Sequence, residues 1–275
     1  MHRPVQLSKT LVLLLFVFVC GGIVLAQDNS QTIPVTMPPT RRIEPPSPNA
    51  NVQELIESGD ELQSEKAFLD AIDYYQAALK KVDRKDPQAA AIYNKMGITQ
   101  LQLRHFYEAR KSFQKAVAID RGNSQAMNNL GVVFYYDKKY GRAIKYYKRA
   151  ITMGPDNASY HSNLGSAYFS KKDLPNAVTE YAKAMQLDPN IFERRSNMGM
   201  VLQMSSPDDR AQFSYLLAKM YAQQGQFERS LLYLRRAMEE GYKDIQNVYQ
   251  DAEFAQLRKD ERFVALMKQP PPAIP

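Results

Sequence analysis

The chain has 275 residues, a formal net charge of +7 and a single cysteine. One cysteine excludes an internal disulfide framework and a cysteine-rich zinc site, because each of these needs several cysteines. With only three histidines, no phosphate-binding glycine loop and no G-x-S-x-G segment, the chain has no catalytic constellation. We therefore expect a protein that is not an enzyme and uses no cofactor or metal, and the absence of a nucleic-acid-binding motif disfavours a nucleic-acid partner.

Residues 1–26 have the layout of a secretory signal peptide. The basic residues His2, Arg3 and Lys9 precede an apolar run over residues 11–19. Small or modest side chains over residues 24–26 then occupy the positions that a signal peptidase reads. The sequence predicts export, with cleavage after Ala26 and a mature protein without cysteine.

Two alternatives for this segment stay open. An uncleaved membrane anchor is disfavoured because the apolar stretch of about 16 residues is short for a bilayer, which needs roughly 20. Lipidation of Cys20 is disfavoured because Phe18 and Val19 precede it, where a bacterial lipobox has small residues.

Residues 27–50 are expected to form a spacer. Proline among polar residues favours extended, semi-rigid backbone and provides no apolar residues for a core. The prolines are Pro34, Pro38, Pro39, Pro45, Pro46 and Pro48.

The glycines at positions 97, 131, 165 and 199 are spaced 34 residues apart three times in succession. A fixed period of this length is typical of stacked repeats rather than of one closed globule. It predicts units over residues 52–85, 90–123, 124–157 and 158–191, with an irregular region over residues 192–240. The first connection is longer by four residues, because Gly59 precedes Gly97 by 38.

The same apolar and small residues return around each glycine. Such a pattern predicts two antiparallel helices per unit, with glycine and alanine where the helices approach closely and large side chains filling the space between them. A proline such as Pro155 or Pro189 then ends the second helix. The third unit has Leu130, Gly131, Phe134, Ala143, Tyr147 and Ala150, and the fourth has Leu164, Gly165, Tyr168, Ala177, Tyr181 and Ala184.

This pattern resembles the tetratricopeptide repeat over roughly residues 52–240. The resemblance implies an all-α fold, a right-handed superhelical solenoid of antiparallel helix pairs. It also implies a scaffold that binds a protein or peptide partner, because most family members do so, and it favours an exported bacterial protein in the periplasm or at the cell surface.

After Gly199 the repeat changes its register. Ser206 followed by Pro207 and two acidic residues is typical of a new helix start, with Ser206 as the N-cap. We expect three consecutive helices near residues 192–204, 208–223 and 227–240.

Residues 241–269 are expected to form capping helices that cover the last apolar face of the solenoid. Phe254 and Leu257 recur nine residues later as Phe263 and Leu266, and these four side chains are the expected cap. The tail over residues 270–275 begins with three prolines and cannot be helical.

The resemblance also implies where a ligand binds, since in this family the first helix of each unit faces the groove. Asn129, Asn163 and Asn197 share position 6 of three successive units, and Lys95 occupies that position in the second. An asparagine can donate to and accept from a peptide backbone at once, although asparagine is also frequent here in the repeat consensus without a ligand. The predicted groove set comprises Asn94, Asn128, Asn129, Tyr135, Tyr136, Ser162, Asn163, Ser166, Phe169, Ser196 and Asn197.

These observations favour an exported, non-enzymatic scaffold that binds a peptide segment in its concave groove. His161 is expected to be a packing residue rather than a metal ligand. The alternative is an envelope assembly or tethering factor that uses its basic outer face, including Lys145, Lys148 and Arg149, for peripheral contact with membrane or cell-wall polymer.

Overall fold

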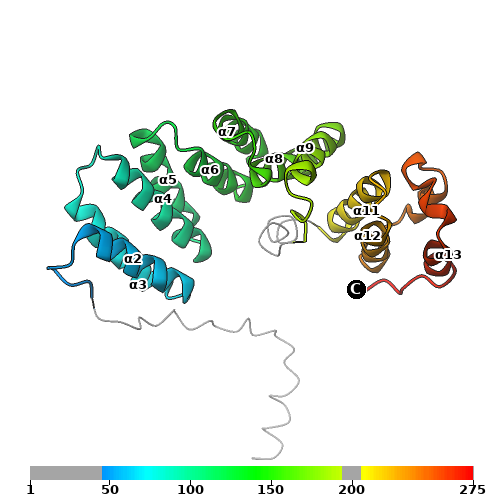
Figure 1. The fold of residues 1–275 in the computed structure, drawn as a ribbon, viewed down its shortest axis with the longest axis horizontal. Coiled ribbons are helices and arrows are strands. Elements are labelled where there is room, and N and C mark those ends of the chain that lie inside the picture. The colour runs from blue at the N-terminus through cyan, green and yellow to red at the C-terminus, as the bar shows by residue number, and fades with distance from the viewer. Residues whose placement is uncertain (1–44, 194–205, 275) are drawn as a thin grey trace, which may run out of the picture. The chain divides into compact units, whose positions relative to one another are not determined.

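The structure is a computed structural model of the 275-residue chain and describes residues 45–193 and 206–274. Over these two ranges the backbone forms helices and no strand, which confirms the all-α prediction (Figure 1). The expected signal peptide, most of the spacer, and the groove residues Ser196 and Asn197 lie outside the described residues.

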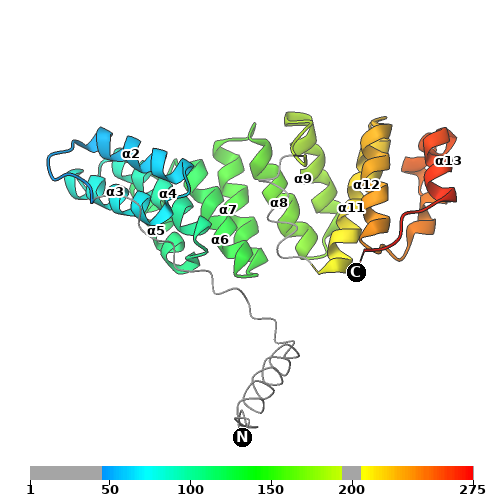
Figure 2. The same ribbon diagram turned by 90° about the horizontal axis from the view of Figure 1, so that it is seen from below.

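Four antiparallel helix pairs follow one another with nearly constant lengths (Figure 2). Three of the four first helices have 13 residues and all four second helices have 14. Pro155 and Pro189 each follow the end of a second helix by two residues, as expected for helix-terminating prolines. The pairs are α2 (Val52–Ser64) with α3 (Phe68–Lys81), α4 (Pro87–Gln102) with α5 (Phe106–Ile119), α6 (Ser124–Tyr136) with α7 (Tyr140–Met153), and α8 (Ala158–Ser170) with α9 (Leu174–Leu187).

The longer first connection extends a helix more than it extends a loop. Helix α4 has 16 residues and begins with Pro87, so three of the four additional residues belong to the helix. Asp86 caps it by accepting a hydrogen bond from the Gln88 backbone N–H at 2.8 Å. Proline suits the first position because its missing N–H would have no partner inside the helix.

Within the described residues, each repeat glycine accommodates one aromatic ring from the second helix of its own unit. A Cβ built on Gly131 would lie 2.6 Å from the ring of Tyr147, and one on Gly165 would lie 2.6 Å from that of Tyr181. Tyr75 and Phe113 occupy the equivalent places over the glycines at 59 and 97, and all four rings are buried. Glycine therefore recurs in each of these units because an aromatic ring packs directly on the helix backbone at that position.

The turn inside each pair places one basic residue in the left-handed region. The φ angles of Lys66, Arg104, Lys138 and Lys172 lie between 57° and 64°. In the α6–α7 turn, the Lys138 N–H donates to the Tyr135 carbonyl and the Lys139 N–H to the Phe134 carbonyl, which satisfies the last carbonyls of α6. The later turn between α11 (Pro207–Gln223) and α12 (Phe227–Glu239) uses Gly225 at φ 72° instead.

The irregular region contains two of its three expected helices, α11 (Pro207–Gln223) and α12 (Phe227–Glu239). Ser206 caps α11, as predicted, in a reciprocal capping box with Asp209. The third expected helix, near 192–204, falls almost entirely outside the described residues. Phe192 at its edge is buried against Tyr181 and Phe213.

The C-terminal segment closes the core with short 3-10 helices and one α-helix. Phe254, Leu257, Phe263 and Leu266 are all buried in one cluster with side chains of α11 and α12, as predicted for a cap. The elements are η1 (Ile245–Tyr249), η2 (Ala252–Phe254), η3 (Leu257–Lys259) and α13 (Glu261–Lys268).

Candidate functional site

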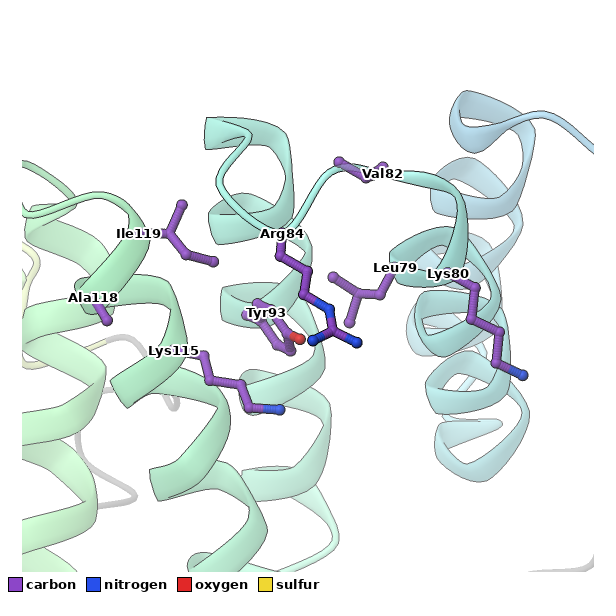
Figure 3. A pocket seen from close by; sticks show the side chains of 8 residues that line it. All are labelled: Leu79, Lys80, Val82, Arg84, Tyr93, Lys115, Ala118 and Ile119. Atoms are coloured by element: carbon purple, nitrogen blue, oxygen red, sulfur yellow. The ribbon is translucent and has the colours of Figure 1, made fainter.

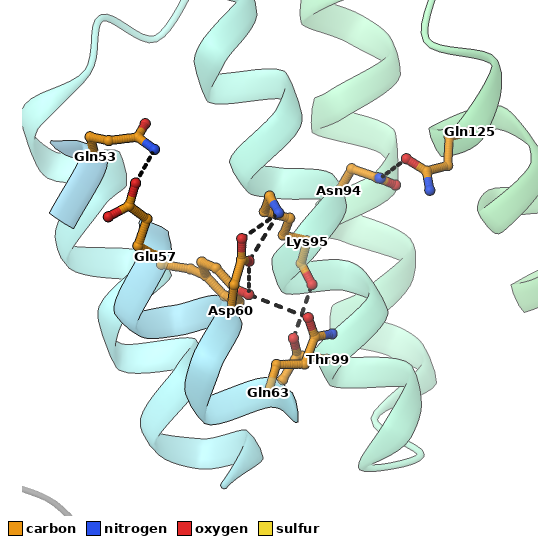
Figure 4. A network of polar contacts seen from close by, with 9 residues as sticks. Gln53, Glu57, Asp60, Gln63, Asn94, Lys95, Thr99 and Gln125 are labelled. Atoms are coloured by element: carbon orange, nitrogen blue, oxygen red, sulfur yellow. Dashed lines mark hydrogen bonds and ion pairs between the residues drawn. The ribbon is translucent and has the colours of Figure 1, made fainter. Parts of the chain in front are cut away.

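Neighbouring first helices are joined by polar side chains, which together form the first-helix face of α2, α4, α6 and α8. In Figure 4 the polar residues of α2, α4 and α6 lie along successive helices and are linked by hydrogen bonds. This face is where the sequence predicted a ligand.

The asparagines of this face bind one another across the helix boundaries. The Asn129 side chain donates from Nδ2 to Asn94 Oδ1 at 3.0 Å, and Asn163 Nδ2 donates to Asn128 Oδ1 at 2.9 Å. In both pairs, position 6 of one unit donates to position 5 of the unit before it. The asparagine pattern is therefore, first of all, a device that fixes adjacent units in register.

These bonds belong to a longer series, which we call the amide chain. Asn128 Nδ2 donates to Asn129 Oδ1 at 3.3 Å, and Asn94 Nδ2 donates to Gln125 Oε1 at 3.0 Å. The donors thus run in one direction, from Asn163 through Asn128, Asn129 and Asn94 to Gln125. Hydrogen bonds aligned in this way polarise one another, so the amide chain holds its members more firmly than isolated pairs would.

Between α2 and α4 an ion pair replaces the amides. Lys95 Nζ lies 2.9 and 2.7 Å from the two carboxylate oxygens of Asp60 (Figure 4). The Tyr75 hydroxyl donates to Asp60 Oδ1 at 2.7 Å. Burial of Tyr75, and secondarily its bond to the Asp60 carboxylate, raises the pKa of Tyr75 well above its usual value. The Lys95 and Asp60 side chains keep 37% and 40% of their surface exposed, so this pair is accessible to a ligand.

Burial separates the predicted groove residues into two groups. Asn129 and Tyr136 are half-buried and reach the surface. The remaining polar members are buried, and their side chains serve the contact between helices more than they serve the surface: Asn94, Asn128, Ser162, Asn163 and Ser166.

The expectation that Tyr135 and Phe169 offer apolar surface to a ligand is wrong. Both occupy position 12 of their units, where the side chain reaches the next unit instead of the groove. The Tyr135 hydroxyl lies 2.9 Å from Ser170 Oγ, and the Phe169 ring meets that of Phe213 edge-on at 5.7 Å. The two side chains are 2% and 3% exposed, and burial raises the pKa of Tyr135 to about 12.

Comparison with known families gives a direct answer on the repeats. Residues 59–124, 94–158 and 128–190 match one model of the tetratricopeptide repeat, and residues 214–249 match a second. The chain belongs to the tetratricopeptide repeat family. The helix pairs within these residues are therefore tetratricopeptide repeat units.

Solved structures share this fold at low sequence identity. PilF of Pseudomonas aeruginosa is 18% identical, with 79% of this chain and 90% of that chain covered and a TM-score of 0.52. MamA from Desulfovibrio magneticus RS-1 is 17% identical, with 70% and 97% covered and a TM-score of 0.49. YrrB, described as a TPR protein with an unusual peptide-binding site, is 22% identical, with 76% and 92% covered and a TM-score of 0.46. No curated protein sequence matches the chain.

His161 is held in place from both sides of its ring. Its Nε2 donates to the Pro155 carbonyl at 2.9 Å, and its Nδ1 lies 2.6 Å from Glu180 Oε2. The side chain is buried, so it packs within its repeat and leaves no ring nitrogen for a metal. No group of three or more metal-ligating side chains occurs within residues 45–193 and 206–274.

The opposite face of the third repeat unit is basic. Helix α7 carries no acidic residue, and three of its cations lie over aromatic rings: Arg142 over Phe134 at 5.6 Å, Lys148 over Tyr168 at 5.7 Å and Arg149 over Tyr146 at 5.9 Å. None of the helices in the described parts of the chain is long and apolar enough to cross a membrane.

Proposed function

We propose that the chain is an exported scaffold that binds an extended peptide segment of a partner protein along its first-helix face. Tetratricopeptide repeat folds are typical of scaffolds that bind proteins or peptides. The proposal of a peptide at this particular face rests on the geometry of the amide chain.

Asn129 is the residue that carries the proposal. A primary amide has two N–H donors and two acceptor lone pairs, and Asn129 uses one of each within the amide chain. One donor and one acceptor remain on a half-buried side chain whose orientation is already fixed. A peptide bond offers the complementary carbonyl and N–H, so it could bind without the entropic cost of ordering this asparagine.

The accessible Asp60–Lys95 pair extends the same surface toward α2. It offers a carboxylate and an ammonium group to the side chains or termini of a bound segment. Because both groups are already paired with each other, they would contribute selectivity for the charge pattern of a partner more than affinity.

The test begins with affinity capture of partners from envelope extracts and their identification by mass spectrometry. Titration of a captured partner against Asn129→Ala should show binding weakened by about 1 kcal/mol, or roughly fivefold. Helicity by circular dichroism should be retained. Buried Asn163 is unsuitable for this purpose, because its removal would leave the Asn128 carbonyl without its donor and so lower stability as well.

The control reverses the charge of Lys145, Lys148 and Arg149 on the exposed side of α7. Binding at moderate salt should stay close to that of the wild type. If this variant abolishes binding while Asn129→Ala leaves it unchanged, the peptide proposal fails. The protein would then be a tether that contacts membrane or cell-wall polymer through α7, a function that the absence of acidic residues on this helix favours.

Export is supported by the basic, apolar and small-residue order of residues 1–26. Intact-mass measurement of the protein from its native host should give a chain that begins at Gln27. A mass that includes Met1 would contradict cleavage and favour an anchor. A diacylglyceryl addition at Cys20 would identify a lipoprotein instead.

A further inference from the structure

A second recess lies away from the amide chain, between the second helices α3 and α5 and the loop that leads into α4 (Figure 3). Its volume is about 720 Å³, which is in the range of sites that hold small ligands or single peptide side chains. We call it the α3–α5 pocket. It is lined by Leu79, Lys80, Val82, Arg84, Tyr93, Lys115, Ala118 and Ile119.

The pocket has an apolar floor and a basic rim. Leu79, Val82, Tyr93 and Ile119 are half-buried, so part of each side chain faces the opening. Lys80, Arg84 and Lys115 are exposed, and no acidic residue is among the lining residues. The described parts of the chain place no carboxylate in ion-pair contact with these three cations. The rim therefore carries positive groups that are not held in ion pairs, next to accessible apolar surface.

One cation lies over the Tyr93 ring, and a second lines the same pocket. Lys115 Nζ lies 4.9 Å from the centre of the Tyr93 ring, and Figure 3 shows Arg84 reaching toward the same ring from the loop. Lys80 lies at the margin and points away from them. The space beside Tyr93 thus offers two positive groups at the edge of an apolar surface.

We propose that the α3–α5 pocket binds an acidic peptide segment in which a carboxylate stands next to an aliphatic or aromatic side chain. The carboxylate pairs with Arg84 and Lys115, and the apolar side chain covers Tyr93 and its neighbours on the floor. This site is independent of the first-helix face, and it adds a second point of contact on the other side of the repeats.

The depth of the apolar floor favours a peptide over a membrane. A flat anionic bilayer could reach the exposed cations, but its surface could not fill a recess whose apolar groups are half-buried. A single projecting side chain with a neighbouring carboxylate satisfies both the rim and the floor. Anionic vesicles therefore serve as the competing ligand in the experiment.

The probe is a fluorescent peptide in which glutamate alternates with leucine, titrated by anisotropy against the full chain. Lys115→Glu should weaken binding about tenfold, because reversal replaces an attraction by a repulsion. Lys111→Glu is the matched control. Lys111 lies on the same helix and also over a tyrosine, at 4.4 Å from the Tyr107 ring, but outside the pocket. It should change binding less than about twofold.

Two further probes separate the rim from the floor. A peptide with serine in place of leucine should bind about tenfold more weakly, because its side chains cannot cover the floor. A peptide with lysine in place of glutamate should not bind. Arg84→Glu, in the loop before α4, provides a second reversal should Lys115→Glu lower helicity.

Several outcomes would overturn the proposal. No binding of the glutamate and leucine peptide by the wild type would do so, as would equal losses for Lys111→Glu and Lys115→Glu, which would indicate diffuse charge attraction. Unchanged affinity of the serine peptide would show that the floor takes no part. Binding of phosphatidylglycerol vesicles that Lys115→Glu abolishes, without peptide binding, would identify a membrane contact. None of these results involves Asn129, so the proposed function stands or falls separately.

Discussion

At Gly131 the space that a side chain would fill is occupied by the ring of Tyr147. Gly131→Ala should therefore destabilise the protein by about 1 to 3 kcal/mol, because the buried ring must shift. Gly141→Ala is the matched comparison. Gly141 lies in α7 with nothing within 4 Å of its added Cβ, so alanine there should stabilise by about 0.5 to 1 kcal/mol.

Thermal and denaturant unfolding of the two variants would measure these opposite signs. The larger change Gly131→Leu should lower the melting temperature further. If both Gly131 variants were as stable as the wild type, the close packing of the Tyr147 ring on Gly131 would be contradicted.

One of the rings that pack on the repeat glycines carries a buried hydroxyl without a hydrogen-bond partner in the described part of the chain. Tyr147 Oη is buried and has no hydrogen-bond partner among the described residues, whereas the second unit already has Phe113 at this position. Tyr147→Phe should stabilise by about 1 kcal/mol, because it removes the cost of burying an unpaired hydroxyl. Tyr75→Phe should have the opposite effect, since it removes the hydrogen bond to Asp60.

Urea unfolding of Tyr147→Phe and Tyr75→Phe would decide the point. Equal effects of the two changes would show that the hydroxyl of Tyr147 finds a partner in solution. Both variants should keep the helicity of the wild type, because the ring that fills the glycine site is unchanged.

Among the elements, the left-handed turns invite a direct test. Lys138 adopts φ 57°, a conformation that costs a residue with a Cβ roughly 1 to 2 kcal/mol. Lys138→Gly should therefore raise stability by about 0.5 to 1 kcal/mol after allowance for the greater freedom of glycine in the unfolded chain. Lys138→Ala controls for the loss of charge and should give no gain. A melting temperature unchanged or lowered by glycine would contradict the strain inferred for this turn.

The sequence was informative wherever one residue type determines local geometry. The glycine period predicted the helix pairs, and Ser206 with Pro207 predicted the start of α11, because caps and close approaches depend on single residues. The partner of an asparagine or aromatic side chain depends on the neighbouring unit. The prediction for position 12 was therefore wrong at Tyr135 and Phe169, whereas Asn129 and Tyr136 do reach the surface.

The amide chain did leave a signal that could have been used. Asn94 precedes Asn129 by 35 residues, and Asn128 precedes Asn163 by the same interval. This interval is one residue longer than the 34-residue period. It indicates that the two asparagines contact each other across neighbouring units, and not that equivalent asparagines line up toward a ligand. In contrast, no sequence pattern indicated that most of the capping helices would be short 3-10 helices.

For the whole molecule, the buried tyrosines predict instability at alkaline pH. Burial is the main cause that raises the pKa of Tyr75, Tyr147, Tyr181 and Tyr215 above the usual value of 10.0. A folded-state pKa above that of the unfolded chain gives stability that is complete below pH 10.0 and is lost as pH rises further, because the unfolded state then releases more protons. The fold should therefore weaken progressively above this pH.

Tyrosinate absorbance and far-ultraviolet circular dichroism, followed together during an alkaline titration, would check this. The buried tyrosines should ionise in a cooperative step that coincides with the loss of helix. Ionisation of all tyrosines near their ordinary pKa, with helicity intact, would contradict the burial of these four tyrosine side chains.

The direction of the amide chain has a consequence for how such a protein can change length. If residues 124–157 were excised as a block, Asn163 would follow Asn94 at the spacing that Asn129 has now, and donor would again meet acceptor. Gly131 and Tyr147 would leave together, so no ring would lose its glycine. The third unit thus contributes one asparagine to each of two equivalent pairs, Asn129 with Asn94 and Asn128 with Asn163. A whole period can therefore be gained or lost with the pairing of position 6 to position 5 retained, whereas a single-residue insertion within a first helix would disrupt this pairing.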